Sequence, residues 1–161
     1  EIEADLARSH ATADLAQRRA RILLVDDDPD VLNVAAAIVA ELGFEVSPAE
    51  DGEAALKLIG AQPFHLLITD VAMPGMNGVE LARRVRAAAP TMPILFASGY
   101  TDLQTFGAEL ESENLIKKPF RIAEVAARIH GALDAAAAQQ AASLLFDING
   151  RSASEPPAGH A

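Results

Sequence analysis

The sequence RILLVDDDP, residues 21–29, decides the fold class of this chain. Its first five residues form a short apolar run, which is typical of a strand buried on both faces of a parallel sheet. Three aspartates follow at once, and Pro29 suits the first turn of a helix, with Asp28 as its N-cap. A buried strand joined to a helix by a short acidic loop indicates an α/β protein.

The same alternation of apolar runs and helical periods continues along the chain. Five such units predict an α/β fold of the flavodoxin-like, doubly wound kind, in which helices cover both faces of a five-stranded parallel sheet through right-handed crossovers. After the first strand we expect strands at 44–47, 64–69, 93–97 and 115–117, and helices at 29–42, 51–59, 79–89, 102–110 and 122–133.

The two ends of the chain differ from this central domain in composition. We expect a helical connector at 1–20, the α/β domain at 21–133, a helical extension at 134–149 and a disordered tail at 150–161 that is rich in Ser, Gly and Pro. The sequence starts at Glu1 rather than Met, which we interpret as excision from a longer protein.

Composition excludes several classes of function. The 161 residues contain no Cys, so disulfide frameworks, thiolate zinc sites and cysteine nucleophiles are excluded. The net charge of −10 disfavours nucleic acid as a direct partner, and nothing after residue 134 is long or basic enough for a helix-turn-helix. No apolar run approaches the ~20 residues that span a bilayer, so we expect a cytoplasmic domain without direct membrane contact.

Polar residues stand at the ends of the predicted strands: Asp26 and Asp27, then Asp70, Ser98 and Lys118. In open α/β sheets, ligands bind outside the carboxyl ends of the strands. Clustered carboxylates repel one another, and Mg²⁺ would relieve that repulsion. The cation would also neutralise a phosphoryl group whose oxygens Ser98 and Lys118 could hold. Asp70, the single acid on the middle strand, would then be the nucleophile.

Each residue alone has an ordinary explanation as a helix cap, turn former or surface lysine, but their coincidence at strand ends favours a site.

Four segments carry a family resemblance: LLVDDD at 23–28, TDVAMPGMNG at 69–78, ASG at 97–99 and KKPF at 117–120. Together they resemble the receiver (phosphoacceptor) domain of two-component response regulators, over about residues 20–134. The resemblance implies the sheet order 2-1-3-4-5. It also implies that Asp70 takes a phosphoryl group from a phosphohistidine on a histidine kinase or histidine phosphotransfer protein.

The resemblance further implies a Mg²⁺ site. Asp27 and Asp70 would bind the ion directly, together with the backbone carbonyl of Ala72, and Asp26 would act mainly through water.

The remaining site residues also follow from the resemblance. Ser98 would contact the phosphoryl group and shift with it, while Lys118 would pair with its oxygens. The Lys118–Pro119 peptide would be cis, which fits the small cis penalty of proline. Gly78 would supply a backbone position close to the loop after Asp70.

Two positions depart from the family pattern. Leu115 stands where many receivers carry an aromatic residue that swings inward on phosphorylation, so the usual coupling to Ser98 is in doubt. Tyr100 is a candidate substitute in this switch, and a half-buried loop aromatic is an equally good interpretation. Neither Ala72 nor Tyr100 supplies a carboxylate or amide to orient an attacking water, so we expect slow loss of phosphate and no enzyme activity in this chain.

The outward face of the first helix carries Val34, Ala37 and Ala40. Such small apolar residues would suit docking of the helical bundle that bears the donor histidine. An alanine-rich helix that fills surface positions with good helix formers is a comparable explanation.

Several other functions compete with a phosphoacceptor that relays a signal. The chain could be the receiver of a hybrid histidine kinase, acting as an intramolecular regulator, or a degenerate receiver used only for interaction. A haloacid-dehalogenase-like Mg²⁺-dependent phosphatase would need a second acid where Ala72 stands. A flavin-binding module would need a Ser/Thr/Gly phosphate loop where the chain has the acids 26–28. The tail helices leave dimerisation open.

Overall fold

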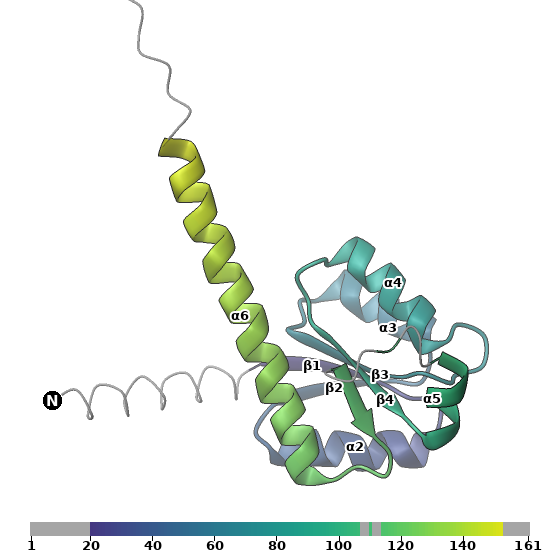
Figure 1. Ribbon diagram of the computed structural model, residues 1–161. Helices are drawn as coiled ribbons and strands as arrows, with labels where there is room; N and C mark the ends of the chain where they lie inside the picture. The colour runs from purple at the N-terminus through teal and green to yellow at the C-terminus, as the bar shows by residue number, and fades with distance from the viewer. Residues whose placement is uncertain (1–19, 107–109, 111–113, 153–161) are drawn as a thin grey trace, which may run out of the picture.

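The computed structural model describes residues 20–106, 110 and 114–152. Within them, five parallel strands form one sheet in the order β2-β1-β3-β4-β5, which confirms the expected fold and topology (Figure 1). The elements in chain order are β1 (Arg21–Val25), α2 (Pro29–Glu41), β2 (Glu45–Ala49), α3 (Gly52–Ala61), β3 (Leu66–Asp70), α4 (Gly78–Ala88), β4 (Ile94–Ser98), α5 (Tyr100–Phe106), β5 (Leu115–Lys117) and α6 (Ile122–Ser152).

Helices lie on both faces of the sheet, with α2 and the start of α6 on one side and α3 and α4 on the other (Figure 1). Successive side chains of a strand point to opposite faces, so both sets must be apolar when both faces are covered. In β1, for example, Leu23 and Val25 pack toward α3 and α4, while Ile22 and Leu24 pack toward α2 and α6. This division explains the uninterrupted apolar runs of the sequence.

The strand register brings the carboxyl ends of the central strands to one edge. Val25 pairs with Thr69, and Asp70 with Ala97. Ser98 pairs with Lys117. The residues at and just after these strand ends are therefore neighbours in space, although they are far apart in the sequence.

The last helix of the α/β domain and the helical extension expected at 134–149 form one continuous helix. A single helix, α6, crosses the expected boundary at residue 133 and continues to Ser152, three residues into the stretch expected to be disordered. Its alanine- and glutamine-rich second half favours helix without tertiary support, and no proline interrupts it. That half projects away from the sheet and leaves Leu144 and Leu145 exposed (Figure 1).

Other expected segments fall partly outside the described residues. The helix expected at 102–110 is found at Tyr100–Phe106, and residues 107–109 are not described. Residues 1–19 of the expected connector and 153–161 of the expected tail also lie outside the described part.

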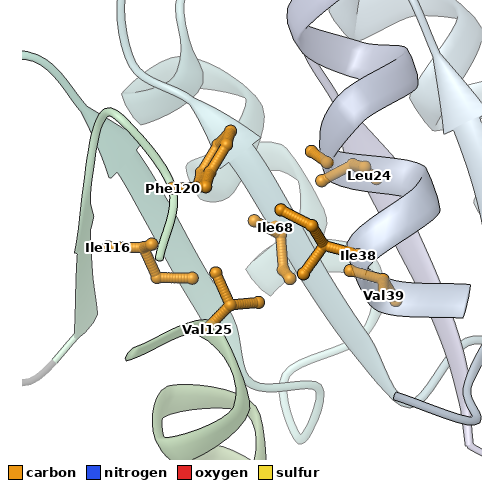
Figure 2. Close-up of a pocket in the computed structure, with 8 residues that line it drawn as sticks. Leu24, Ile38, Val39, Ile68, Ile116, Phe120 and Val125 are labelled. Carbon is orange, nitrogen blue, oxygen red and sulfur yellow. The ribbon is translucent and has the colours of Figure 1, made fainter. Parts of the chain in front are cut away.

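A small cavity of about 10 Å³ lies between α2, the sheet and the start of α6 (Figure 2). A space of this size could hold about one water, but its lining offers no polar side chain to bond one. It is therefore a packing void within the core on this side of the sheet. Its lining is Leu24, Ala35, Ile38, Val39, Ile68, Ile116, Phe120 and Val125.

Candidate functional site

Three aspartates meet at the carboxyl edge of the sheet. Asp26 and Asp27 follow β1, Asp70 ends β3, and each of the three offers a carboxylate oxygen within 4.8 Å of the others. Asp26 and Asp70 are buried and Asp27 is exposed. Hard oxygen ligands at this spacing suit a hard cation, so this acidic cluster (Asp26, Asp27 and Asp70) could bind a metal ion, as the sequence predicts.

Lys118 joins two members of the acidic cluster. Its Nζ lies 2.9 Å from Asp26 Oδ2 and 3.1 Å from Asp70 Oδ1. The backbone fixes its position, because the Lys118 N–H donates to the Ser98 carbonyl at 2.9 Å. The Lys118–Pro119 peptide is cis, as the resemblance implies. The positive charge of the site therefore comes from the end of β5.

Burial and ion pairing together set the ionisation of Asp70 and Lys118. Burial raises the pKa of Asp70 to about 6, with smaller contributions in the same direction from the charges of Asp26 and Asp102, and against the opposing effect of Lys118. Burial alone would lower the pKa of Lys118, but its bonds to Asp26 and Asp70 outweigh that effect and raise it. At neutral pH the lysine is therefore charged, and Asp70 holds a carboxylate whose charge is poorly solvated.

Ser98 ends β4 and is 1% exposed. Its Oγ is buried and has no hydrogen-bond partner among the described residues. A buried hydroxyl without a partner is costly and needs an explanation. Its position beside Lys117 in the sheet register makes it a free donor at the same edge as the acidic cluster.

The loop after Asp70 returns tightly to the strand end at Gly78. The Gly78 N–H donates to the Val71 carbonyl at 2.9 Å. A Cβ at Gly78 would collide with the carbonyl oxygen of Asp70 and lie 2.9 Å from its carbonyl carbon. Only glycine allows α4 to begin this close to Asp70, in agreement with the predicted backbone role. Ala72 lies in the same loop and is exposed. Its backbone carbonyl is the metal ligand that the resemblance implies.

The two candidate switch residues beside Ser98 differ in what the structure shows. Leu115 is buried in a cluster that also contains Phe96, and the partly buried Phe106 packs against this cluster. An aliphatic side chain already inside the core supplies no aromatic ring that could swing inward. Tyr100 begins α5, but its side chain lies outside the described part of the structure.

One residue near the site escapes the sequence analysis. Asp102, in the first turn of α5, accepts a hydrogen bond from the Gly99 N–H at 2.9 Å through Oδ2. Its charge also contributes to the raised pKa of Asp70. The available signal was an acid three residues after a glycine at a strand end, which is a capping pattern.

A doubly wound sheet with an acidic cluster, a lysine and a buried hydroxyl at one edge defines a class of phosphoacceptor signalling domains. The family model of the response regulator receiver domain matches residues 22–130, and the chain belongs to this family. Its members act in two-component signalling with histidine kinases or phosphotransfer proteins as partners.

Individual relatives agree with this assignment. The chain is 32% identical over 118 residues to the response regulator receiver protein CpdR of Brucella abortus, covering 72% of this chain and 98% of that protein. It is 36% identical to the regulatory protein VanRB of Enterococcus faecalis, over 70% of this chain, and spans about half (52%) of that relative.

Solved structures show the same fold. A putative response regulator from Chloroflexus aurantiacus is 32% identical with a TM-score of 0.66, covering 72% of this chain and 98% of that one.

Among the described residues, none of the helices is both long and apolar enough to cross a membrane.

Proposed function

We propose that this chain is a Mg²⁺-dependent phosphoacceptor in which Asp70 takes a phosphoryl group from a phosphohistidine and relays it in a two-component pathway. The observation that carries the proposal is the meeting of three kinds of group at one edge: the acidic cluster, the Lys118 ammonium and the unpartnered hydroxyl of Ser98. The donor is a histidine kinase or a histidine phosphotransfer protein.

The transfer needs only positioning and charge from the protein. An oxygen of the Asp70 carboxylate attacks phosphorus, so a P–O bond forms while the P–N bond breaks and its electron pair returns to the imidazole of the donor. The Lys118 ammonium neutralises negative charge on the transferred oxygens, and the Ser98 hydroxyl donates to one of them. Low solvation of the Asp70 carboxylate favours its attack.

The acidic cluster fits Mg²⁺, because it offers hard carboxylate oxygens close together and one of its members faces solvent. Asp27, Asp70 and the Ala72 carbonyl would hold the ion directly, with Asp26 acting mainly through water. Bound Mg²⁺ supplies positive charge that offsets the repulsion among the carboxylates and between them and the phosphoryl group.

The outer face of α2 gives the donor a surface next to the site. Val34 is 57% exposed, and Ala37 and Ala40 are also exposed. A groove connects this face to the site lysine and is lined by Asp30, Val31, Val34, Lys118, Pro119 and Phe120. A helical bundle seated on this apolar surface would bring its phosphohistidine to Asp70.

We infer that the chain carries a phosphoryl group rather than turning over a substrate. Ala72 offers neither an acid nor an amide to activate water, which also disfavours an aspartyl phosphatase. The domain would act in the cytoplasm, as a separate regulator or as the receiver of a hybrid histidine kinase, without binding nucleic acid directly.

The test is incubation with Mg²⁺ and a small phosphodonor, acetyl phosphate, followed by intact mass measurement. A single phosphoryl adduct that disappears in Asp70→Asn supports the proposal. Absence of an adduct in the unmodified protein, or an adduct that survives in Asp70→Asn, would falsify it.

A further inference from the structure

Thr69 directly precedes Asp70 in β3 and is 0% exposed. Its neighbours on the same side of the strand, Leu67 and Val71, belong to the apolar cluster that packs toward α3 and α4. Valine has the same branched shape and would suit such a position in a strand equally well. The shape of the side chain therefore explains its place in the core, but its buried hydroxyl needs an explanation of its own.

The hydroxyl bonds the backbone of the residue proposed to take the phosphoryl group. Thr69 Oγ1 donates a hydrogen bond to the Asp70 carbonyl oxygen at 2.9 Å, in a place that is closed to solvent. Along the described part of β1, the pairing with β3 ends at Val25 and Thr69, one residue before this carbonyl. The hydroxyl thus supplies a donor at the point where the ladder with β1 stops.

Backbone contacts hold the peptide that follows Asp70 on its other sides. Gly78 lies so close that a Cβ there would collide with the Asp70 carbonyl oxygen. The Val71 N–H donates to the Ala97 carbonyl at 3.3 Å, and the Val71 carbonyl accepts from the Gly78 N–H at 2.9 Å. The Thr69 hydroxyl is the side-chain member of this set of contacts, so a substitution can remove it alone.

We propose that Thr69 is a positioning residue of the phosphorylation site: its hydroxyl fixes the Asp70 carbonyl and thereby the backbone that carries the Asp70 carboxylate. A peptide that loses this bond can rotate, and the attached side chain moves with it. The carboxylate then spends less time in the geometry that phosphoryl transfer needs, beside the Lys118 ammonium. The same rotation would move the start of the loop that carries Ala72.

This inference rests on the proposed phosphorylation of Asp70, and Thr69 acts through Asp70 rather than by contact with the phosphoryl group. Two substitutions separate the hydroxyl from the packing of the side chain. Thr69→Val removes the hydroxyl and keeps the branched shape, whereas Thr69→Ser keeps the hydroxyl and loses a methyl group. Ile129→Val is the matched control, because it removes one methyl group from a side chain that is 0% exposed on the other side of the sheet.

The first measurement needs neither metal nor phosphate. It is the backbone carbonyl ¹³C resonance of Asp70, together with hydrogen exchange of the Gly78 amide, by NMR of the whole chain. We expect Thr69→Val to move the carbonyl resonance upfield and to speed exchange, since a carbonyl that loses its donor becomes less polarised and its peptide less restrained. Thr69→Ser and Ile129→Val should leave both unchanged. An unaltered Asp70 carbonyl in Thr69→Val would overturn the inference.

The second measurement is the Mg²⁺ affinity by NMR titration and the rate of phosphorylation by acetyl phosphate at saturating Mg²⁺. We expect Thr69→Val to weaken the affinity and to slow phosphorylation, each by about three- to tenfold, as for a small misplacement of a reacting group. Thr69→Ser and Ile129→Val should react at the rate of the unmodified protein. Equal rates in Thr69→Val and the unmodified protein, or equal slowing in Thr69→Val and Thr69→Ser, would overturn the role of the hydroxyl.

The two proposals fail in different ways. If the unmodified protein gains no phosphoryl group, the proposed function fails and the inference about Thr69 falls with it. If the unmodified protein is phosphorylated and Thr69→Val reacts as fast, the inference about Thr69 alone is wrong.

Discussion

The Lys118 ammonium lies 3.1 Å from Asp70 Oδ1, an ion pair that links the edge strand of the sheet to its middle strand. The pair forms where two segments 48 residues apart in sequence reach the same edge. Lys118 also contacts Asp26, so its ammonium offsets part of the negative charge of the two buried carboxylates.

Lys118→Met should raise the pKa of Asp70 further above about 6, since Lys118 is the group that lowers it. The carboxyl would then ionise at higher pH, and phosphorylation by acetyl phosphate at pH 7 should slow by at least tenfold. Carbon NMR titration of the Asp70 carboxyl without metal measures the first effect. An unchanged or lower pKa in the variant would contradict it.

Asp70→Asn should stabilise the protein at neutral pH in the presence of EDTA. The folded-state pKa of about 6 lies above the ordinary value of 3.8, so the folded state binds more protons between these values and its stability falls as pH rises from about 4 to 6. Asparagine removes this loss, which is on the order of 3 kcal/mol at pH 7.

Urea unfolding of both proteins across this pH range checks the prediction. The gain in the free energy of unfolding should be large at pH 7 and shrink toward pH 4. A gain that stays constant over the range would show that burial of the charge is not its cause.

Mg²⁺ should raise the melting temperature of the unmodified protein, because a ligand that binds only the folded state stabilises it by mass action. Asp27→Asn should reduce this rise, and since Asp27 is exposed, the variant should fold normally without metal. Thermal unfolding at increasing Mg²⁺ concentration measures both effects. Asp28→Asn is the control, because Asp28 caps α2 and is not part of the acidic cluster. An equal Mg²⁺ response in both variants would exclude Asp27 as a ligand.

Gly78→Ala should destabilise the protein by about 1–3 kcal/mol, because the added Cβ forces α4 away from the backbone of Asp70. Gly131→Ala, in the interior of α6, provides the opposite case. An added Cβ meets nothing within 4 Å at that position, so alanine should stabilise the helix by up to about 1 kcal/mol. Chemical unfolding of the two variants should show opposite signs, and a neutral Gly78→Ala would mean that the loop adjusts freely.

Val34→Asp should slow transfer from a phosphorylated histidine donor while leaving the reaction with acetyl phosphate unchanged. The substitution places a charge on the exposed apolar surface of α2 but leaves the acidic cluster intact. Leu144→Asp is the control, because Leu144 is similarly exposed on the projecting half of α6. If both variants slow transfer equally, the docking surface is not on α2.

The sequence predicted the sheet because buried parallel strands leave a plain signature, as in residues 21–25. The acidic cluster was equally visible, since strand ends in this architecture converge whatever the details of the loops. The contact of Asp102 with Gly99 was not predicted, because the spacing of the two residues indicates it only once a helix is known to begin directly after β4. The continuity of α6 across residue 133 and its last three residues, 150–152, were not predicted.

The single helix α6 has a mechanical consequence. It begins three residues after Pro119, close to the lysine of the site, and its last 19 residues, 134–152, extend about 28 Å at a rise of 1.5 Å per residue. A tilt of about 10° at its base would move its far end by about 5 Å. A rearrangement too small to disturb the core beside Lys118 would thus be amplified into a displacement that a neighbouring domain could detect.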